Sequence, residues 1–577
     1  MVPDFFKNFP PVNLLPIRDD KEIANSLRET IVPEANASTE ELAELYAFTL
    51  YENSQYGQEK WQTYFGPLIM SFQDNSVFEE IALNRLTPEV VDYWERRMHE
   101  ASNPLLKARY AGLIWDFSKK IRGTKSPLSV CEIYLENLLV SATTANYSHF
   151  VILFRKLERV ILLAKKTNLT DIMQRGILAL RKLESEVGEL EKPGLWKYSY
   201  SLLVKGKLLE ETDQLEETII NELEQRLKLA TQIRDGRVRD LNAATVAADY
   251  LTDYYRKNHR QLDSARVLAT LRSGFDASAR YANAAMIIHN LESMYERYQE
   301  NGLTKEAATT IAEIRSLGPK LMSEMKAVPV ELTIDMGICD RLIEMIYIDD
   351  DRRTFENLGL HLMENPDSLK KDQVTIYEMV SKGLYTAEGR KTSTVSSITA
   401  DEVGNLMIEM GRSMTIFSPY LQLILRAGRD RGIITLSALT SLVNTCLWFE
   451  PTKLPLYKRA FEAYLTDDYV VFLHLAIPQI EAAVLKIFTD HGGEPWKANR
   501  SGGHHVRLLD EILREKKMEA LIGKNTTLYL RAVLTDQRGW NLRNDIAHGL
   551  MATEAMTAEK ADRIFLLFLL FPFLKIL

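Results

Sequence analysis

The segments AADYLTDYY, residues 247–255, and ARVLATL, residues 265–271, decide which fold the chain is expected to adopt. Each has apolar side chains at helical spacing, and the polar residues between them predict a turn. The segments LESMYERY, residues 291–298, and EAATTIA, residues 306–312, repeat this arrangement around Gly302. Alanines stand where two helices would approach closely. We therefore expect helices that pack in pairs.

These pairs resemble helical hairpins of the tetratricopeptide type. However, Ala265 and Ala307 stand at comparable positions and are 42 residues apart, whereas the usual period is about 34. The spacing therefore predicts an irregular α-solenoid. The default role of such a region is to bind a protein partner along a concave surface.

The N-terminal part is also expected to be helical. Prolines make residues 1–40 irregular, but Ser38 and Glu41 have the spacing of a capping box at a helix start. Thr87 and Pro88 predict another start, with proline at the first helical position. Short breaks separate further helical segments, with no run of strand-like alternation between them.

A polar segment rich in serine and threonine, residues 385–399, predicts a domain boundary or an exposed loop. It divides the chain into a solenoid-like helical region, 1–390, and a second helical region, 400–577. Within the second region, four or five short helices in residues 468–577 predict a helical bundle. The expected fold class is therefore all-α.

Composition agrees with a folded helical protein. The 577 residues are 46% apolar and 26% charged, with few glycines and prolines (27 and 19). The net charge of −8 excludes a global basic surface for nucleic acid, so any such site must be local. Three distant cysteines form no disulfide framework and favour a reducing cytoplasm.

The two ends of the chain bear on membrane association. The N-terminus has no basic start or apolar core of a signal peptide. Near the C-terminus, IFLLFLLFPFL (residues 564–574) is an unbroken apolar run that would extend roughly 16 Å as a helix, about half of a bilayer core. We interpret it as a helix buried on all sides, and expect no membrane contact; a membrane-associated tail is the weaker alternative.

The stretch RGWNLRNDIAHG, residues 538–549, contains the candidate catalytic residues Arg543, Asn544 and His548. A guanidinium is permanently charged and shaped for phosphate, and an imidazole titrates near neutrality. This pair can bind a phosphodiester and move protons without a metal or cofactor. On an ideal helix, Arg543 and His548 would lie about 140° apart. They would then flank a groove, especially where two copies meet across a two-fold axis.

The Arg-Asn-x-x-x-His pattern, placed after a bundle helix and before a last apolar helix, resembles the HEPN superfamily. The longer string from Gly539 to Gly549 is similar to an uncharacterised bacterial family that carries such a domain at its C-terminus, after long helical N-terminal regions. The resemblance covers about a fifth of the chain. It implies a HEPN-type bundle, a homodimer and a metal-independent endoribonuclease, as found in toxins and antiviral effectors.

Transferred to this sequence, the resemblance gives His548 the role of general base and acid and places Arg543 on the scissile phosphate. The 2′-hydroxyl of the RNA would attack, and Asn544 would support the site. The resemblance also implies a role in defence against phage. Some members of the superfamily lack activity, so the alternative is a non-catalytic adaptor whose bundle only dimerises or binds a nucleotide.

The basic segment of residues 491–507 lies close to this motif in the sequence. Lys497, Arg500 and Arg507 are candidates for guiding RNA. Its paired histidines, His504 and His505, lack the cysteine or carboxylate spacing of a zinc site, so we expect a solvated loop and no metal.

Each candidate also has a structural interpretation. Arg543 could pair with a carboxylate, His548 could bind a carbonyl, and Asn544 could cap a helix. For Glu481 a salt bridge is expected, and for Trp540 core packing rather than base stacking. The chain contains no Walker-type phosphate loop, nucleophile elbow or dinucleotide fingerprint.

Overall fold

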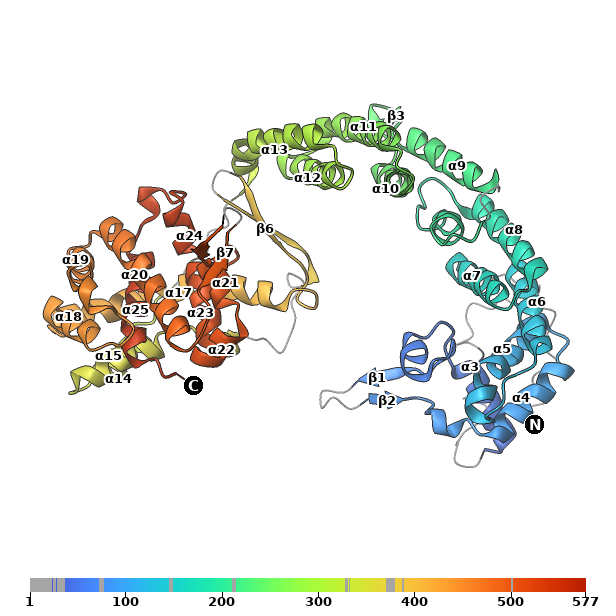
Figure 1. Cartoon of the computed structure of the whole chain (residues 1–577), viewed down its shortest axis with the longest axis horizontal. Coiled ribbons are helices and arrows are strands. Elements are labelled where there is room, and N and C mark those ends of the chain that lie inside the picture. Colours follow the sequence, from blue (N-terminus) through green and yellow to red (C-terminus); the bar gives the residue numbers. More distant parts are fainter. Residues whose placement is uncertain are drawn as a thin grey trace. The chain divides into compact units, whose positions relative to one another are not determined.

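The structure is a computed structural model. Besides Ile23, Leu27 and Glu331, it describes residues 37–71, 77–144, 149–209, 214–326, 333–369, 379–386, 389–499 and 502–576. Helices make up most of these residues, which confirms the predicted all-α character, and the described strands form two-stranded antiparallel hairpins (Figure 1). The chain forms two compact units, Met1–Ile311 and Ala312–Leu577.

The first unit is a succession of helices with short connections. Its helices are α3 (Thr39–Thr49), α4 (Pro88–Glu100), α5 (Pro104–Ile121), α6 (Leu128–Thr144), α7 (Phe150–Lys166), α8 (Thr170–Val187), α9 (Gln214–Ala230), α10 (Leu241–Lys257), α11 (Gln261–Ser278), α12 (Ala284–Glu300) and the start of α13 (Thr304–Glu324). Two π-helical turns, η3 (Gly57–Trp61) and η5 (Tyr200–Val204), and the hairpins β1–β2 (Ile69–Ser71, Val77–Glu79) and β3–β4 (Ile233–Arg234, Arg237–Val238) lie between them.

The predicted helix starts are found in the structure. Ser38 and Glu41 form the reciprocal hydrogen bonds of a capping box before α3. Helix α4 begins at Pro88, although the side chain of Thr87 makes no capping hydrogen bond. Local sequence chemistry therefore fixed both boundaries. Most of residues 1–40, which the sequence predicts to be irregular, lie outside the described residues.

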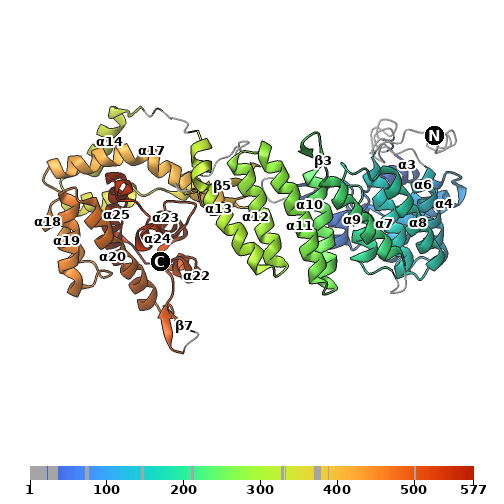
Figure 2. The same ribbon diagram turned by 90° about the horizontal axis from the view of Figure 1, so that it is seen from above.

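The paired helices of the middle region are also present. Helix α10 packs between α9 and α11, and α11 packs on α12, so that neighbours in sequence lie side by side (Figure 2). Ala243, Ala244, Ala247 and Ala248 on α10 are fully buried at these contacts. Their small side chains let the helix axes approach closely.

The second unit contains helices of very different length, from 5 residues in α21 to 29 in α17, packed around one core. Its elements are α14 (Met336–Ile346), α15 (Asp351–His361), η7 (Pro366–Leu369), β5 (Lys382–Tyr385), β6 (Lys391–Val395), α17 (Glu402–Asp430), α18 (Leu436–Asn444), α19 (Leu454–Leu465), α20 (Tyr469–Asp490), β7 (Trp496–Ala498), β8 (His504–Val506), α21 (Leu509–Leu513), α22 (Lys516–Ile522), α23 (Lys524–Leu534), α24 (Leu542–Ala547) and α25 (Ala558–Leu570).

The division after Ile311 differs from the division between residues 390 and 400 that the sequence predicts. The polar segment 385–399 instead contributes strand β6 to the β5–β6 hairpin, and the side chain of Val395 is buried. Helix α15 packs on α25 so closely that a Cβ on Gly359 would lie 2.5 Å from the carbonyl oxygen of Leu569. The core around α25 is therefore incomplete without residues that precede the predicted boundary.

Helix α25 is the centre of this core. Every residue from Ala561 to Phe571 is buried, which confirms the predicted burial on all sides for Ile564–Phe571, whereas the last three residues of the predicted run, 572–574, are half-buried. Phe565 stacks on Tyr464 with 4.1 Å between the ring centroids, and Phe568 lies 5.2 Å from Phe461. The α-helix ends at Leu570, before Pro572.

One helix among those described, α20, is long and apolar enough to cross a membrane. It passes this test by length and composition, which a core helix of a folded protein also passes. Its apolar side chains Phe472, Ala476, Ile480 and Val484 are buried within the second unit. Helix α20 therefore packs on α25 and contributes its apolar side chains to the core of the second unit.

Asp562 predicts a pH dependence of stability. Its carboxyl is buried and accepts a hydrogen bond of 2.6 Å from the Tyr464 hydroxyl, and burial raises its pKa from 3.8 to about 6. Because the folded pKa is raised, ionisation destabilises the folded state as pH rises through that value. We expect the free energy of unfolding to increase by about 1 kcal/mol from pH 7.5 to pH 5.

The measurement is urea unfolding at several pH values, with Asp562→Asn as the comparison. Asparagine keeps an acceptor for Tyr464 but does not titrate, so the increase should disappear. An equal increase in the variant would contradict the assignment to Asp562.

Candidate active site

A tight turn between α23 and α24 places the candidate residues. A Cβ on Gly539 would lie 2.3 Å from the carbonyl oxygen of Ala532, so only glycine fits there. The indole Nε1 of Trp540 donates to the Gly411 carbonyl on α17 at 3.1 Å, in agreement with the packing role expected for Trp540. Asn541 then adopts a left-handed conformation (φ +51°) and begins α24.

Arg543 is held by a carboxylate of α20. Its Nε and Nη2 donate to the two oxygens of Glu481 at 2.9 and 3.0 Å, which confirms the salt bridge expected for Glu481. Its Nη1 donates to Oδ1 of Asn544 at 3.1 Å. The side chains of Arg543 and Glu481 are 20% and 28% exposed. The guanidinium is thus fixed by a two-pronged ion pair while one edge stays accessible to solvent.

Asn544 connects this arginine to the preceding turn. While its Oδ1 accepts from Arg543, its Nδ2 donates to the Thr535 carbonyl at 3.1 Å and to Oδ1 of Asn541 at 2.8 Å. The bonds of the Asn544 side chain are therefore made to Arg543, Thr535 and Asn541, and they neither cap the helix nor orient the His548 imidazole. Its amide positions the Arg543 guanidinium relative to the end of α23.

His548 lies at the opposite end of α24 and is exposed. It is the C-cap residue, and its backbone N–H donates to the Asn544 carbonyl at 3.0 Å. Gly549 follows with φ +64° and turns the chain away. In the described part of the chain, no hydrogen bond joins Arg543 to His548. The structure thus brings together Arg543, Asn544 and Glu481, and leaves the imidazole facing solvent.

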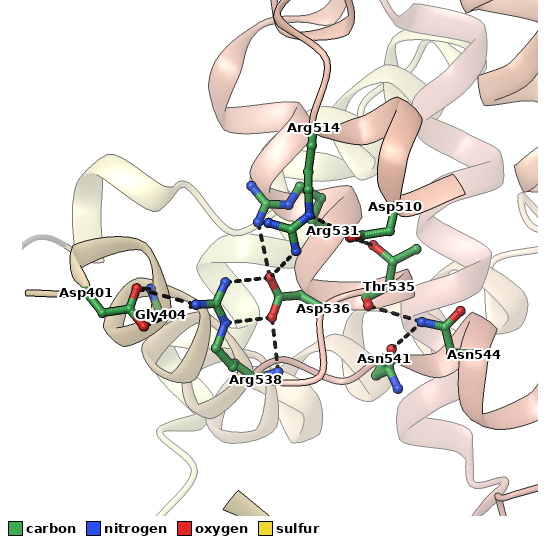
Figure 3. Close-up of polar contacts among 10 residues, drawn as sticks. All are labelled: Asp401, Gly404, Asp510, Arg514, Arg531, Thr535, Asp536, Arg538, Asn541 and Asn544. Carbon is green, nitrogen blue, oxygen red and sulfur yellow. Dashed lines mark hydrogen bonds and ion pairs between the residues drawn. The ribbon is translucent and has the colours of Figure 1, made fainter. Parts of the chain in front are cut away.

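Arg514, Arg531 and Arg538 surround Asp536 next to the turn (Figure 3). The carboxylate of Asp536, whose side chain is only 3% exposed, binds Nη2 of Arg531 at 3.2 Å and Nη2 of Arg514 at 3.4 Å. It also receives two hydrogen bonds from Arg538, at 2.8 and 2.9 Å. Three guanidinium groups therefore converge on one buried carboxylate.

Electrostatics keep this cluster charged. Burial alone would raise the pKa of the Asp536 carboxyl, but the hydrogen bonds and charge of Arg538 outweigh it and hold the pKa below its usual value. Arg538 also reaches Asp401, the N-cap residue of α17, at 3.3 Å. The turn before α24 is thereby tied to the start of a helix more than a hundred residues earlier in the chain.

Sequence reasoning missed this cluster. Arg538 opens the motif, but Arg514 and Arg531 belong to other helices and carry no spacing that points to Asp536. The available signal was a lone aspartate, Asp536, directly after the apolar helix α23 and two residues before an arginine.

The basic segment near the motif is a hairpin. Strands β7 and β8 pair antiparallel, with Lys497 opposite His505. Lys497 binds Glu511 at 2.8 Å, and Arg507 binds Glu515 at 2.5 Å, so carboxylates already compensate both cations. Arg500 lies outside the described residues. His504 and His505 are exposed on β8, and among the described residues no group of three histidines, cysteines or carboxylates is placed to hold a metal ion.

Comparisons with protein-family models, with curated proteins and with solved structures find no match for this chain. What the site can do must therefore be argued from its own residues.

The Asp536 cluster predicts a large effect on stability. Asp536→Asn removes the negative charge and leaves the guanidinium groups of buried Arg531, half-buried Arg538 and exposed Arg514 around a neutral side chain. We expect a loss of about 3 kcal/mol in the free energy of unfolding. Asp490→Asn is the control, because Asp490 forms an exposed pair with Lys486 (43% and 41% exposed). It should lose less than about 0.5 kcal/mol. Urea unfolding followed by circular dichroism distinguishes the two, and equal losses would contradict the argument.

Proposed function

We propose that this chain is a metal-independent endoribonuclease of HEPN type, with Arg543 binding the scissile phosphate and His548 transferring protons. The observation that carries the proposal is the short helix α24. It presents a guanidinium held in a fixed orientation at its first turn and an exposed imidazole at its C-cap. Cleavage of a phosphodiester uses a cation that stabilises the charge developing on the phosphate and a group that transfers protons.

The proposed reaction is an internal transesterification. The 2′-oxygen of the RNA forms a bond to phosphorus while the bond from phosphorus to the 5′-oxygen breaks. His548 accepts the 2′ proton, and the protonated imidazole returns a proton to the leaving oxygen. The products are a 2′,3′-cyclic phosphate and a free 5′-hydroxyl. Acid–base catalysis of this kind contributes roughly 10²–10⁴-fold.

Arg543 retains capacity for a phosphate. The bonds to Glu481 and Asn544 use three of its five N–H groups, and the side chain is partly exposed. An incoming phosphate would bind Arg543 beside Glu481 or displace it. Glu481 therefore orients the guanidinium and also competes with the phosphate for it. Asn544 fits the supporting role proposed for it, because it orients the arginine.

Two copies of the chain would complete the site. Arg543 faces α20 and His548 faces solvent, so one copy does not bring the two groups against one phosphate. Around His548 the surface is small or apolar: Ala547, Gly549 and Leu550 are exposed, Leu550 to 53%. An exposed apolar side chain beside a catalytic group is consistent with a partner surface. We therefore propose a homodimer through this face of the bundle.

The first unit would serve as a docking or sensing region. Its helices pack mainly on their neighbours in sequence, as in α-solenoids, where repeats form an extended surface for a protein partner. A cytoplasmic toxin or anti-phage effector is the role that the HEPN resemblance supports for the whole chain.

One observation favours a second candidate function, a non-catalytic helical adaptor. Both oxygens of Glu481 are bonded to Arg543, and a bidentate ion pair of this kind is a common structural link between helices. In an adaptor, α24 would only join α20 to α23 and dimerise.

The nuclease proposal predicts RNA cleavage in EDTA. Purified full-length protein should cut total RNA and leave cyclic phosphate ends, and His548→Ala should lower the rate at least about 10²-fold. Arg543→Gln should lower it comparably, because the phosphate loses its cation. His505→Ala, at an exposed histidine on β8, is the matched control and should keep full activity. Circular dichroism verifies that all variants are folded. Equal behaviour of all four proteins would favour the adaptor.

The dimer proposal predicts that Leu550→Asp yields monomers. A carboxylate at the proposed interface must lose its water without a partner, so sedimentation should show half the mass and cleavage should fall with it. Leu447→Asp, at a leucine of the same unit that is 77% exposed, is the control and should stay dimeric. Monomeric wild-type protein with full activity would contradict the proposal.

A further inference from the structure

A polar pocket of about 440 Å³ lies in the first unit, between helix α7 and the loop of residues 51–66. The loop contributes the amide side chains of Asn53, Gln58 and Gln62, and α7 contributes Arg155, Glu158 and Arg159. The volume is within the range of pockets that bind small molecules. No part of the proposed ribonuclease site belongs to it.

The loop that forms one wall is pinned at its base. Tyr51 and Gly66 exchange two backbone hydrogen bonds of 2.8 and 3.0 Å. Inside the loop, a Cβ on Gly57 would lie 2.6 Å from the Phe65 carbonyl oxygen, so the π-helical turn packs directly on the returning strand. Asn53 and Gln62, which both line the pocket, have left-handed backbone (φ +52° and +54°). Such strain and π-helical turns are concentrated at functional sites.

The other wall is one face of α7. Residues 155, 158, 159 and 162 follow the i, i+3, i+4, i+7 spacing that places side chains on a single stripe. The apolar face of the helix, with Phe154, Leu157 and Ile161, is buried in the core. The pocket stripe instead carries three charged groups and Leu162. Arg155 and Arg159 are like charges four residues apart, an arrangement that destabilises a helix unless an anion compensates it.

The charges on this stripe are only partly compensated. Arg159 lies 3.4 Å from Asp116 and stacks 4.1 Å from the centre of the Tyr64 ring. In the described part of the chain, neither Arg155 nor Glu158 has an ion-pair partner. Burial raises the pKa of the Glu158 carboxyl, and the charge of Arg155 opposes this only in part. The cation Arg155 and the anion Glu158 are therefore available to a ligand. The charges of Arg159 and Asp116 compensate each other.

We propose that this pocket binds a small zwitterion of the α-amino acid class, with the ligand carboxylate at Arg155 and its ammonium group at Glu158. The lining side chains Arg155, Glu158 and Arg159 carry a net charge of +1, and Asp116, paired with Arg159, compensates it, so an ion of one sign would be repelled by Arg155 or by Glu158. A zwitterion pairs with both. The amides of Gln58 and Gln62 offer further hydrogen bonds, and Leu162, 45% exposed at the pocket wall, gives an apolar side chain a surface to contact.

Calorimetric titration of the full-length protein with each of the L-amino acids tests the proposal. At least one should bind, and its amide and its N-acetyl derivative should bind at least about tenfold more weakly, because each lacks one of the two charges. Inorganic phosphate should not bind at this pocket. No binding of any amino acid, or equal binding of the acid and its amide, would overturn the proposal.

Two substitutions locate the binding. Arg155→Gln and Glu158→Gln should each weaken the binding of the preferred amino acid at least about tenfold, and circular dichroism should show unchanged folding because Arg155 is exposed and Glu158 is partly exposed. Lys182→Gln removes one charge from the neighbouring helix α8, where the lysine is 78% exposed, and should leave binding unchanged. Wild-type affinity in both pocket variants would overturn the assignment, as would phosphate binding that Arg155→Gln abolishes.

Discussion

Three guanidinium groups, from Arg514, Arg531 and Arg538, converge on the buried carboxylate of Asp536, and the geometry of the C-terminal unit depends on this contact. A single buried carboxylate with several donors is stable only when the donors stay in place, since each charge would otherwise be left without compensation. The cluster therefore fixes the ends of α21 and α23 and the turn before α24. Through Asp401 it also fixes the start of α17.

The turn before α24 holds the residues of the candidate site in a defined geometry. Gly539 passes against the backbone of Ala532, Trp540 anchors on α17, and Asn544 reaches back to Thr535. Arg543 is then presented to Glu481 in a single orientation. Such positioning by surrounding contacts is what a catalytic guanidinium needs, and it is equally what a structural ion pair needs. The two proposed functions differ in the molecule that contacts α24, which is RNA for the nuclease and only a second copy of the chain for the adaptor.

The first unit is built on a different principle. Its helices bury small side chains such as Ala247 and Ala248 against the next helix, so the order of helices in space follows their order in sequence. The pocket beside α7 departs from this regularity, because a loop rather than the next helix faces the stripe of α7 that carries Arg155, Glu158 and Arg159. A sensing region that binds a small zwitterion would give the chain a chemical input separate from its proposed ribonuclease site.

The sequence by itself determined the helical class, the capped helix start at Ser38, the helix start at Pro88, and the burial of the helix from Ile564 to Leu570. These features depend on neighbours within one or two helical turns, where the periodicity of apolar residues and the chemistry of caps act directly. It also predicted a salt bridge for Glu481, which the structure shows with Arg543. The common role predicted for Arg543, Asn544 and His548 stays a proposal.

Only the tertiary structure decided which groups meet. Glu481 and Arg543 are 62 residues apart, and Asp401 and Arg538 are 137 residues apart. No spacing rule connects such positions, since they meet only when the core around α25 packs. Long-range packing also explains why the first compact unit ends at Ile311 rather than near residue 390. It likewise pairs Lys497 and Arg507 with carboxylates. Local patterns specify helices, whereas long-range packing determines which charges are left for a ligand.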